Sequence, residues 1–205
     1  RPAGISPVLD ERIDEGGQAW AFPDPYVFLP AAGLSGNNNY YITGTGFRMA
    51  VTTDFTPETT QLVPLEVDFG SEGHFGPSGF WSFRPYHHTD GTWHGYGTIH
   101  YGWFRTVVAH FVPQEGQQWT ADQPITKWRF DRVLVGDRAA GVDAYDSELV
   151  RDKDGTLYLI YDSSYPPEAP DGNVHILAQR MLAPGRIDRS FRPRPLLSPE
   201  GLRSE

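Results

Sequence analysis

The chain contains the stretch Asp24-Pro25-Tyr26-Val27-Phe28, which leads through a turn signal at Asn37-Asn38-Asn39 into Tyr40-Tyr41-Ile42-Thr43-Gly44. An aspartate introduces an aromatic and β-branched run, asparagines favour a turn, and a tyrosine-rich run follows. This order predicts two β-strands joined by a loop.

The same pattern occurs twice more in the chain. Asp146-Ser147-Glu148-Leu149-Val150 leads to Leu157-Tyr158-Leu159-Ile160-Tyr161, with an Asp-Gly turn between them. The middle copy runs from Trp81-Ser82-Phe83-Arg84-Pro85-Tyr86 to Trp93-His94-Gly95-Tyr96-Gly97 and lacks the leading aspartate. A repeat of roughly 50 to 65 residues is typical of a β-propeller blade.

Further strand-like runs follow each pair, such as residues 47–53 and 61–65 in the first unit and 174–180 and 195–197 in the third. No segment keeps a helical period for a dozen residues, and the 22 Gly and 18 Pro are spread along the chain. The sequence therefore predicts an all-β fold with four strands in each unit, which is the number a propeller blade requires.

The three units span about residues 20–70, 75–137 and 141–198, within a single domain at 1–205. Propellers typically close with four to eight blades, and fewer blades leave exposed sheet edges. We therefore expect an incomplete propeller that associates with a complementary C-terminal fragment or chain carrying the remaining blades, or aggregates.

Composition excludes several classes of partner. The formal net charge of −9 argues against a nucleic-acid ligand, because phosphate binding needs clustered Lys and Arg. No apolar run is long enough for a membrane span, and no cysteine is present to form a disulfide framework or act as a nucleophile. The 6 Trp, 10 Tyr and 12 Phe suit both sheet cores and stacking on sugar rings, with core packing expected for most of them.

Two of the units resemble a known family. Residues 20–26 with 40–45 resemble the first blade of glycoside hydrolase family 43, which includes β-xylosidases, α-L-arabinofuranosidases and arabinanases, and 141–161 is similar to its third blade. The family commonly opens its second blade with Trp-Ala-Pro, where this chain has Trp81-Ser82-Phe83, so subfamily and substrate stay open. The resemblance implies a five-bladed β-propeller, of which this chain supplies the first three four-stranded blades.

The resemblance also implies catalytic roles. Asp24 matches the general base of an inverting glycosidase, although an Asp-Pro turn without chemistry is the alternative. Asp146 matches the carboxylate that modulates the pKa of the general acid, with Asp143 and Glu148 competing for that assignment. The acid itself is a glutamate that opens the fourth blade in the family. Neither Glu200 nor Glu205 fits this role, so the acid is expected beyond Glu205.

Aromatic and basic residues near the expected inner strands are candidates for binding sugar by stacking and by hydrogen bonds from Arg. These candidates are Trp20, Phe22, Trp81, Arg84, Trp93, His94 and Tyr145. Core packing is the alternative for each, except that a buried Arg84 requires a ligand or a carboxylate partner. No cofactor is required, and the clustered histidines match no zinc spacing. The resemblance implies that the propeller axis can hold a structural calcium, and no motif in these three units marks ligands for it.

The sequence therefore predicts a hydrolase of arabinose- or xylose-containing plant polysaccharides or oligosaccharides. A related five-bladed hydrolase with another sugar specificity is one alternative, because fold and carboxylate placement recur among such enzymes. A carbohydrate-binding propeller without catalysis is another. The compartment is left open.

Overall fold

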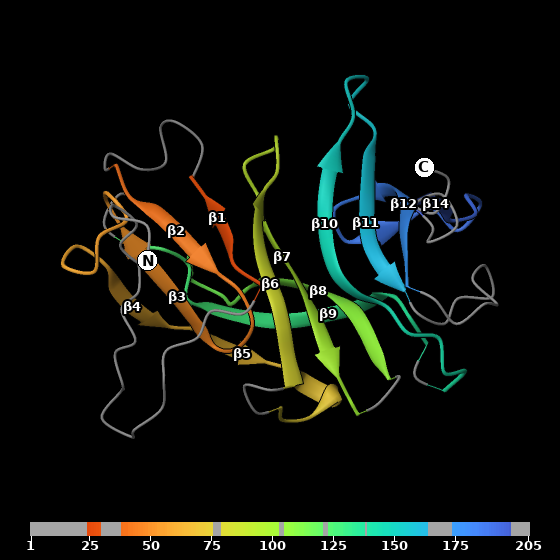
Figure 1. Ribbon diagram of the computed structural model, residues 1–205, viewed down its shortest axis with the longest axis horizontal. Helices are drawn as coiled ribbons and strands as arrows, with labels where there is room; N and C mark the ends of the chain where they lie inside the picture. Colours follow the sequence, from red (N-terminus) through yellow and green to blue (C-terminus); the bar gives the residue numbers. More distant parts are fainter. Residues whose placement is uncertain are drawn as a thin grey trace, which may run out of the picture.

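The computed structural model describes residues 24–29, 38–75, 79–102, 105–120, 123–137, 139–163 and 174–197. Three β-sheets stand side by side in chain order (Figure 1). The 3-10 helix η1 at Gly70–Glu72 is the only helix within these segments. No helix in the described part of the chain is long and apolar enough to cross a membrane.

The first sheet is an antiparallel meander of four strands, as predicted for a blade. Its strands are β1 Tyr26–Phe28, β2 Tyr40–Thr43, β3 Arg48–Thr52 and β4 Gln61–Pro64.

The second sheet has the same meander and one strand more. Its four antiparallel strands are β6 Phe80–His87, β7 Trp93–His100, β8 Thr106–Pro113 and β9 Lys127–Val135. The additional strand, β5 at Glu66–Asp68, pairs in parallel with β9. Residues 66–68 therefore join the second sheet, although the repeat placed them at the end of the first unit.

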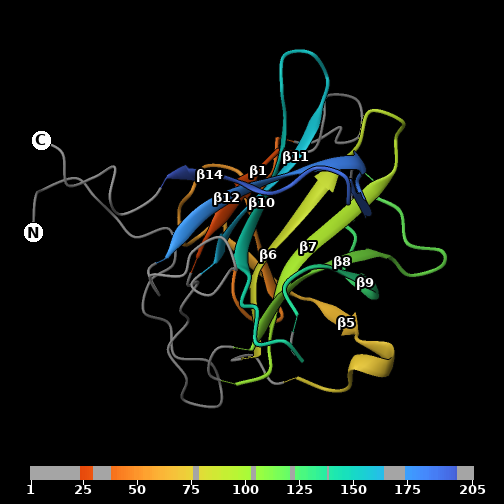
Figure 2. The ribbon, with the colours of Figure 1, turned by 90° about the vertical axis from the view of Figure 1, so that its right-hand side faces the viewer.

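The third sheet lies at the other end of the row, turned relative to the second (Figure 2). Its strands are β10 Tyr145–Arg151, β11 Leu157–Ser163, β12 His175–Ala183, β13 Arg186–Ile187 and β14 Arg194–Leu197. Both β13 and β14 pair with β12, at different parts of its length. This sheet and the second thus have five strands each, where four were expected.

Asp-Gly pairs close the two hairpins that the sequence predicted. Gly91 and Gly155 both adopt a φ of 88°, which glycine tolerates without a Cβ clash. The Asp90 and Asp154 carboxylates each accept the backbone N–H two residues on, at 2.9 Å. This Asx geometry is the reason that Asp-Gly favours turns.

Two apolar cores hold the sheets together, one on each face of the second sheet. Between the first and second sheets the fully buried side chains include Tyr41, Met49, Phe80, Phe83, Phe111 and Trp128. Between the second and third sheets they include Tyr96, Val108, Leu159 and Leu177. Alternation along each strand supplies both faces, because successive side chains point to opposite sides. The second sheet is therefore buried on both faces, like a blade between two neighbours.

Two glycines of β7 let large rings approach its backbone. A Cβ at Gly95 would lie 2.6 Å from Cε2 of Phe83 and 3.2 Å from Cε3 of Trp128. A Cβ at Gly97 would lie 2.6 Å from Cε2 of Phe80. The pattern Gly-Tyr-Gly in this strand therefore places aromatic rings flat against the sheet on one side.

We predict that Gly95→Ala lowers the free energy of unfolding by about 1 to 3 kcal/mol, because the buried rings of Phe83 and Trp128 cannot move away from the new methyl group. Denaturant titration followed by tryptophan fluorescence measures this loss. Gln61→Ala, at an exposed position of β4, is the control and should leave the midpoint near that of the wild type. Equal midpoints for all three proteins would contradict the packing described.

Candidate active site

Three residues at the beginnings of the first strands share an unusual backbone conformation. Asp24, Ser82 and Asp146 have left-handed φ values of 56°, 50° and 50°. A non-glycine residue rarely adopts this conformation, which costs about 1 to 3 kcal/mol and is concentrated at functional sites. The recurrence in all three sheets points to one shared site.

Strand pairing shows that the three residues are equivalent. Each lies two residues before a position that pairs with the second strand of its sheet. These pairs are Tyr26 with Thr43, Arg84 with Tyr96, and Glu148 with Ile160. In the second sheet the strand register shifts between Trp81 and Arg84, and in the third it shifts between Tyr145 and Glu148. Each shift spans the left-handed residue. The bulge turns the left-handed residue out of the regular ladder.

A chain of hydrogen bonds joins the two predicted carboxylates. The hydroxyl of Thr45 donates to Oδ2 of Asp24 at 2.8 Å and accepts the backbone N–H of Ser82 at 3.2 Å. The hydroxyl of Ser82 donates to Oδ1 of Asp146 at 2.6 Å. Asp24 and Asp146 are therefore parts of one polar network, although 122 positions separate them in the sequence.

Each sheet contributes one polar side chain at an equivalent place, from its second strand or, for Thr45, from the bend that follows that strand. Thr98 accepts the backbone N–H of Asp146 at 3.0 Å, as Thr45 does for Ser82. Asp162 is the counterpart of Thr98 in the third sheet, since Thr98 pairs with Trp81 and Asp162 pairs with Tyr145. The sequence analysis did not select Ser82 or Asp162 as site residues.

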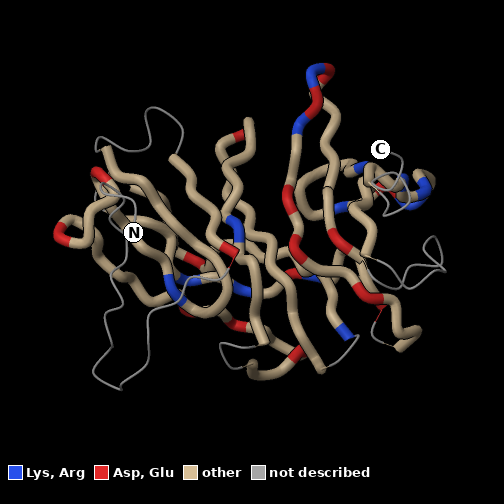
Figure 3. The backbone as a smooth tube through the Cα atoms, in the orientation of Figure 1, with Lys and Arg blue, Asp and Glu red and all other residues tan. Residues whose placement is uncertain are grey.

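Burial and mutual repulsion shift the pKa values of the carboxyl groups. The pKa of Asp146 is raised, chiefly by burial and also by the negative charge of Asp24. The hydrogen bond from Ser82 and the positive charge of Arg84 act in the opposite direction. The pKa of Asp162 rises to about 6, chiefly through burial and then through the charge of Asp146. Acidic residues lie along both β10 and β11, so their charges are close together (Figure 3). Asp162 therefore keeps its proton to a higher pH than an ordinary aspartate does.

A second set of equivalent residues lies two positions further along each first strand. Arg84 forms an ion pair with Glu148, and its guanidinium lies 5.3 Å from the ring centroid of Tyr26. The carboxylate partner expected for a buried Arg84 is therefore Glu148. Burial, and next the charge of Glu148, raise the pKa of Tyr26. These contacts tie the first strands of the three sheets together directly.

Other predicted residues flank this centre. The Trp81 ring stacks on His100 with centroids 4.3 Å apart. Tyr145 is half-buried, and it pairs with Asp162 across β10 and β11. Asp143, which competed with Asp146, is buried and accepts the backbone N–H of Thr106 at 2.9 Å. Of the three acidic candidates, Asp146 is the one joined to Asp24 by hydrogen bonds. Its modulating role stays a prediction.

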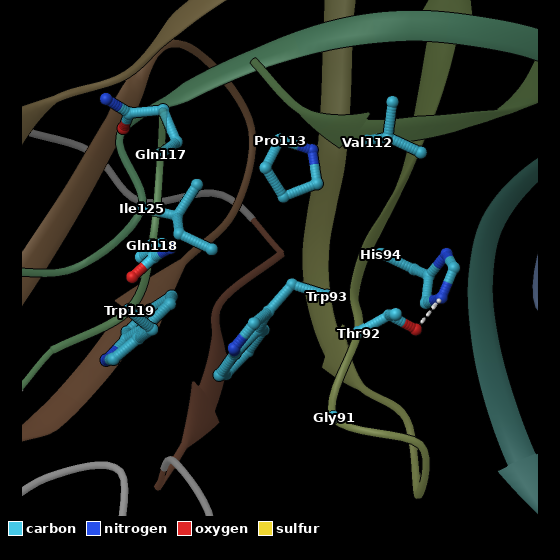
Figure 4. Close-up of a pocket in the computed structure, with 10 residues that line it drawn as sticks. All are labelled: Gly91, Thr92, Trp93, His94, Val112, Pro113, Gln117, Gln118, Trp119 and Ile125. Atoms are coloured by element: carbon cyan, nitrogen blue, oxygen red, sulfur yellow. Dashed lines mark hydrogen bonds between the residues drawn. The ribbon is translucent and has the colours of Figure 1, made fainter. Parts of the chain in front are cut away.

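Trp93 and His94 lie at the other end of β7, beside a hollow of about 520 Å³ (Figure 4). The Trp93 ring stacks on Trp119 with centroids 4.4 Å apart. His94 contacts Thr92 and His110 through its two ring nitrogens, and burial lowers its pKa to about 4. None of the residues that line this hollow belongs to the carboxylate network. The structure therefore does not bring these two residues together with Asp24 and Asp146.

Trp20 and Phe22 lie outside the described residues. Among the residues that are described, no three His, Asp or Glu side chains are grouped so that they could hold a metal ion.

The sequence matches no protein-family model and no curated protein. Its structure is similar to three solved structures that are all 14–18% identical to it. An exo-1,5-alpha-L-arabinanase from a bovine ruminal metagenomic library has 18% identity and a TM-score of 0.59, and the match covers 84% of this chain and 54% of that one. The alpha-L-arabinofuranosidase from Lactobacillus brevis has 14% identity and a TM-score of 0.64, with 95% and 56% covered.

A thermostable family-43 glycoside hydrolase has 17% identity and a TM-score of 0.58, and 87% of this chain and 53% of that chain are covered. The chain thus spans about half the length of the structures it matches. At these identities the likeness shows the fold. The predicted all-β propeller fold, of which this chain supplies a part, is confirmed.

We predict that Asp146→Asn lowers the pKa of Asp162 from about 6 towards its ordinary value, because removal of the neighbouring negative charge favours the ionised form. NMR titration of the ¹³C-labelled aspartate carboxyl carbons measures both groups. Glu66→Gln, which removes an exposed carboxylate of β5, is the matched control and should leave Asp162 unchanged. An Asp162 titration that is the same in all three proteins would show that the two carboxyls do not interact.

Proposed function

We propose that this chain is part of an inverting glycoside hydrolase that acts on arabinose- or xylose-containing plant polysaccharides or their oligosaccharides. One observation carries the proposal: Asp24 and Asp146 occupy equivalent left-handed positions in two blades, joined by hydrogen bonds, in a fold shared with an arabinanase and an arabinofuranosidase. Arabinose-containing chains are the first choice, because the names of both similar enzymes specify arabinose linkages.

In the proposed mechanism Asp24 is the general base. Its carboxylate removes a proton from a water molecule as that water attacks the anomeric carbon, and a carboxylic acid on the opposite side protonates the leaving oxygen. Inverting enzymes hold the base and acid about 6.5 to 9.5 Å apart, which leaves room for the water. The hydroxyl of Thr45 fixes one oxygen of Asp24, so the other oxygen is available to the water.

Asp146 acts in this mechanism through its charge. A negative carboxylate beside the general acid keeps that acid protonated near neutral pH, because two like charges in one site repel. The acid is expected to be a glutamate of a further blade. Arg84 and Tyr26 contribute hydrogen-bond donors beside the carboxylates, which suits the many hydroxyl groups of a sugar.

We predict that Asp24→Ala lowers hydrolysis of arabino-oligosaccharides by about 10²- to 10⁴-fold, which is the usual contribution of a general base. Sugar release is measured on the protein with its propeller complete, and ¹H NMR of the first product shows whether the anomeric configuration inverts. The control Glu66→Gln should retain full activity.

Calorimetric titration with the same oligosaccharides separates the alternatives. Binding without hydrolysis in the complete propeller would replace the enzyme by a carbohydrate-binding module. Hydrolysis that survives in Asp24→Ala would refute the role given to Asp24.

Exposed apolar side chains lie on or beside the first and third sheets. Among the described residues, each of these two sheets packs against another sheet on one face only. They include Val27 and Leu29 at 47% and 58% exposure, and Leu182 and Leu197 at 57% and 53%. Further blades would cover such surfaces in a closed propeller. This supports the proposal that a complementary fragment or chain completes the molecule.

We predict that the isolated chain of 205 residues does not behave as a monodisperse monomer, because its open sheet edges and exposed apolar residues favour association. Light scattering coupled to size-exclusion chromatography measures the molar mass. Lysozyme in the same buffer serves as a monomeric reference. A single monomeric species over a range of concentrations would contradict the proposed open propeller.

A further inference from the structure

Ser82 lies between the two candidate carboxylates, and a hydrogen-bonded path leads from it to each of them. It is fully buried at 0% exposure, whereas Asp146 is only half-buried and Asp24 is exposed. Its hydroxyl donates to Oδ1 of Asp146 at 2.6 Å. Its backbone N–H donates to Thr45, whose hydroxyl donates in turn to Asp24. Ser82 is therefore bonded directly to one carboxylate and through Thr45 to the other.

The backbone of Ser82 indicates that its hydroxyl has a use. A left-handed φ of 50° is strained for serine and easy for glycine, so a glycine would suit the backbone better. Beyond glycine, serine adds a Cβ and a hydroxyl. The hydroxyl has one proton, and that proton is directed at Asp146. The strain is therefore offset by a bond between a buried hydroxyl and a carboxylate.

That bond opposes the other influences on Asp146. Burial and the negative charge of Asp24 favour the neutral form, and Asp162 on β11 adds a further carboxyl group nearby. The guanidinium of Arg84 on β6 favours the ionised form, but Glu148 already forms an ion pair with it. A hydroxyl that donates to a carboxylate stabilises the ionised form and holds one oxygen in place.

We propose that Ser82 is a positioning residue that keeps the carboxylate of Asp146 ionised and fixed in register with Asp24. This inference rests on the proposed function, in which the negative charge of Asp146 keeps a general acid protonated. If Ser82 did not hold that charge, Asp146 would take up the proton at higher pH and would no longer repel an ionised acid. The serine at the second-blade position therefore contributes to the acid limit of the active pH range.

The test compares two Ser82 variants with a control variant by NMR titration of the aspartate carboxyl carbons, in the protein with its propeller complete. Ser82→Ala and Ser82→Gly both remove the hydroxyl, but the glycine also relieves the strained backbone. Ser147→Ala is the matched control, because Ser147 is an equally buried serine beside Asp146 whose hydroxyl has no hydrogen-bond partner within the described residues. Asp146→Asn assigns the resonance.

Both Ser82 variants are expected to raise the pKa of Asp146 by about one unit, and Ser147→Ala should not change it. The two Ser82 variants should differ in thermal stability while agreeing in this shift, which a purely structural role would not produce. An unchanged Asp146 titration in Ser82→Ala and Ser82→Gly would overturn the proposal. So would an equal shift in Ser147→Ala.

This titration is independent of catalysis. If hydrolysis survives in Asp24→Ala while the Asp146 shift is found, the proposed function fails and the positioning role stands. If hydrolysis behaves as proposed while the shift is absent, the positioning role alone fails.

Discussion

The carboxylate network depends on one repeated contact, in which a threonine hydroxyl of one sheet accepts the backbone N–H of a left-handed residue in the next. Thr45 holds Ser82 in this way, and Thr98 holds Asp146. A left-handed residue inside a bulge has an N–H that cannot enter the regular ladder, and leaving it buried without a partner costs about 1 to 3 kcal/mol. The threonines satisfy these groups, and they also bond each sheet to the next at this point. The apolar cores press the sheets together, but they are not directional and do not specify this register.

Sequence reasoning found the repeated strand pairs, the Asp-Gly turns and the all-β class, because each has a local signature. Asp24 and Asp146 were selected through the family resemblance, and their catalytic roles stay predictions. Ser82 and Asp162 have no such signature. Ser82 follows a tryptophan within an aromatic run, which is typical of a core strand, and its importance arises only when a bulge brings it to Asp146. Asp162 follows Tyr161 in an alternating strand, where an acidic residue is usually exposed to solvent. The parallel pairing of β5 with β9 was also invisible, because three residues carry too little pattern to indicate a partner sheet.

Trp93 and His94 were selected because they lie near an expected inner strand. Both lie on β7, the strand that also carries Thr98, so the sequence could not separate them from the carboxylate network. His94 and Thr98 are four positions apart, which is about 13 Å along an extended strand. Asp131, His110 and His94 instead form a row across three strands of the second sheet, with ring nitrogens 2.9 Å apart between the two histidines. Aromatic content near an inner strand therefore indicates a sugar subsite only when the residue lies at the correct end of that strand.

The carboxyl groups of the network differ in the donors that reach them. Asp24 receives a hydrogen bond from Thr45, and Asp146 receives one from Ser82. Arg84, the cation that acts on both Asp146 and Asp162, is engaged by Glu148. Burial without a comparable hydroxyl donor leaves Asp162 as the group whose pKa rises to about 6. Asp162 thus keeps its proton to a higher pH than an ordinary aspartate does, while the Ser82 hydroxyl favours the ionised form of Asp146. A neutral carboxyl can donate a hydrogen bond as well as accept one, which an ionised carboxyl cannot do. With Asp162 protonated, the same network offers acceptors and a donor to a polyhydroxylated ligand that carries no charge of its own.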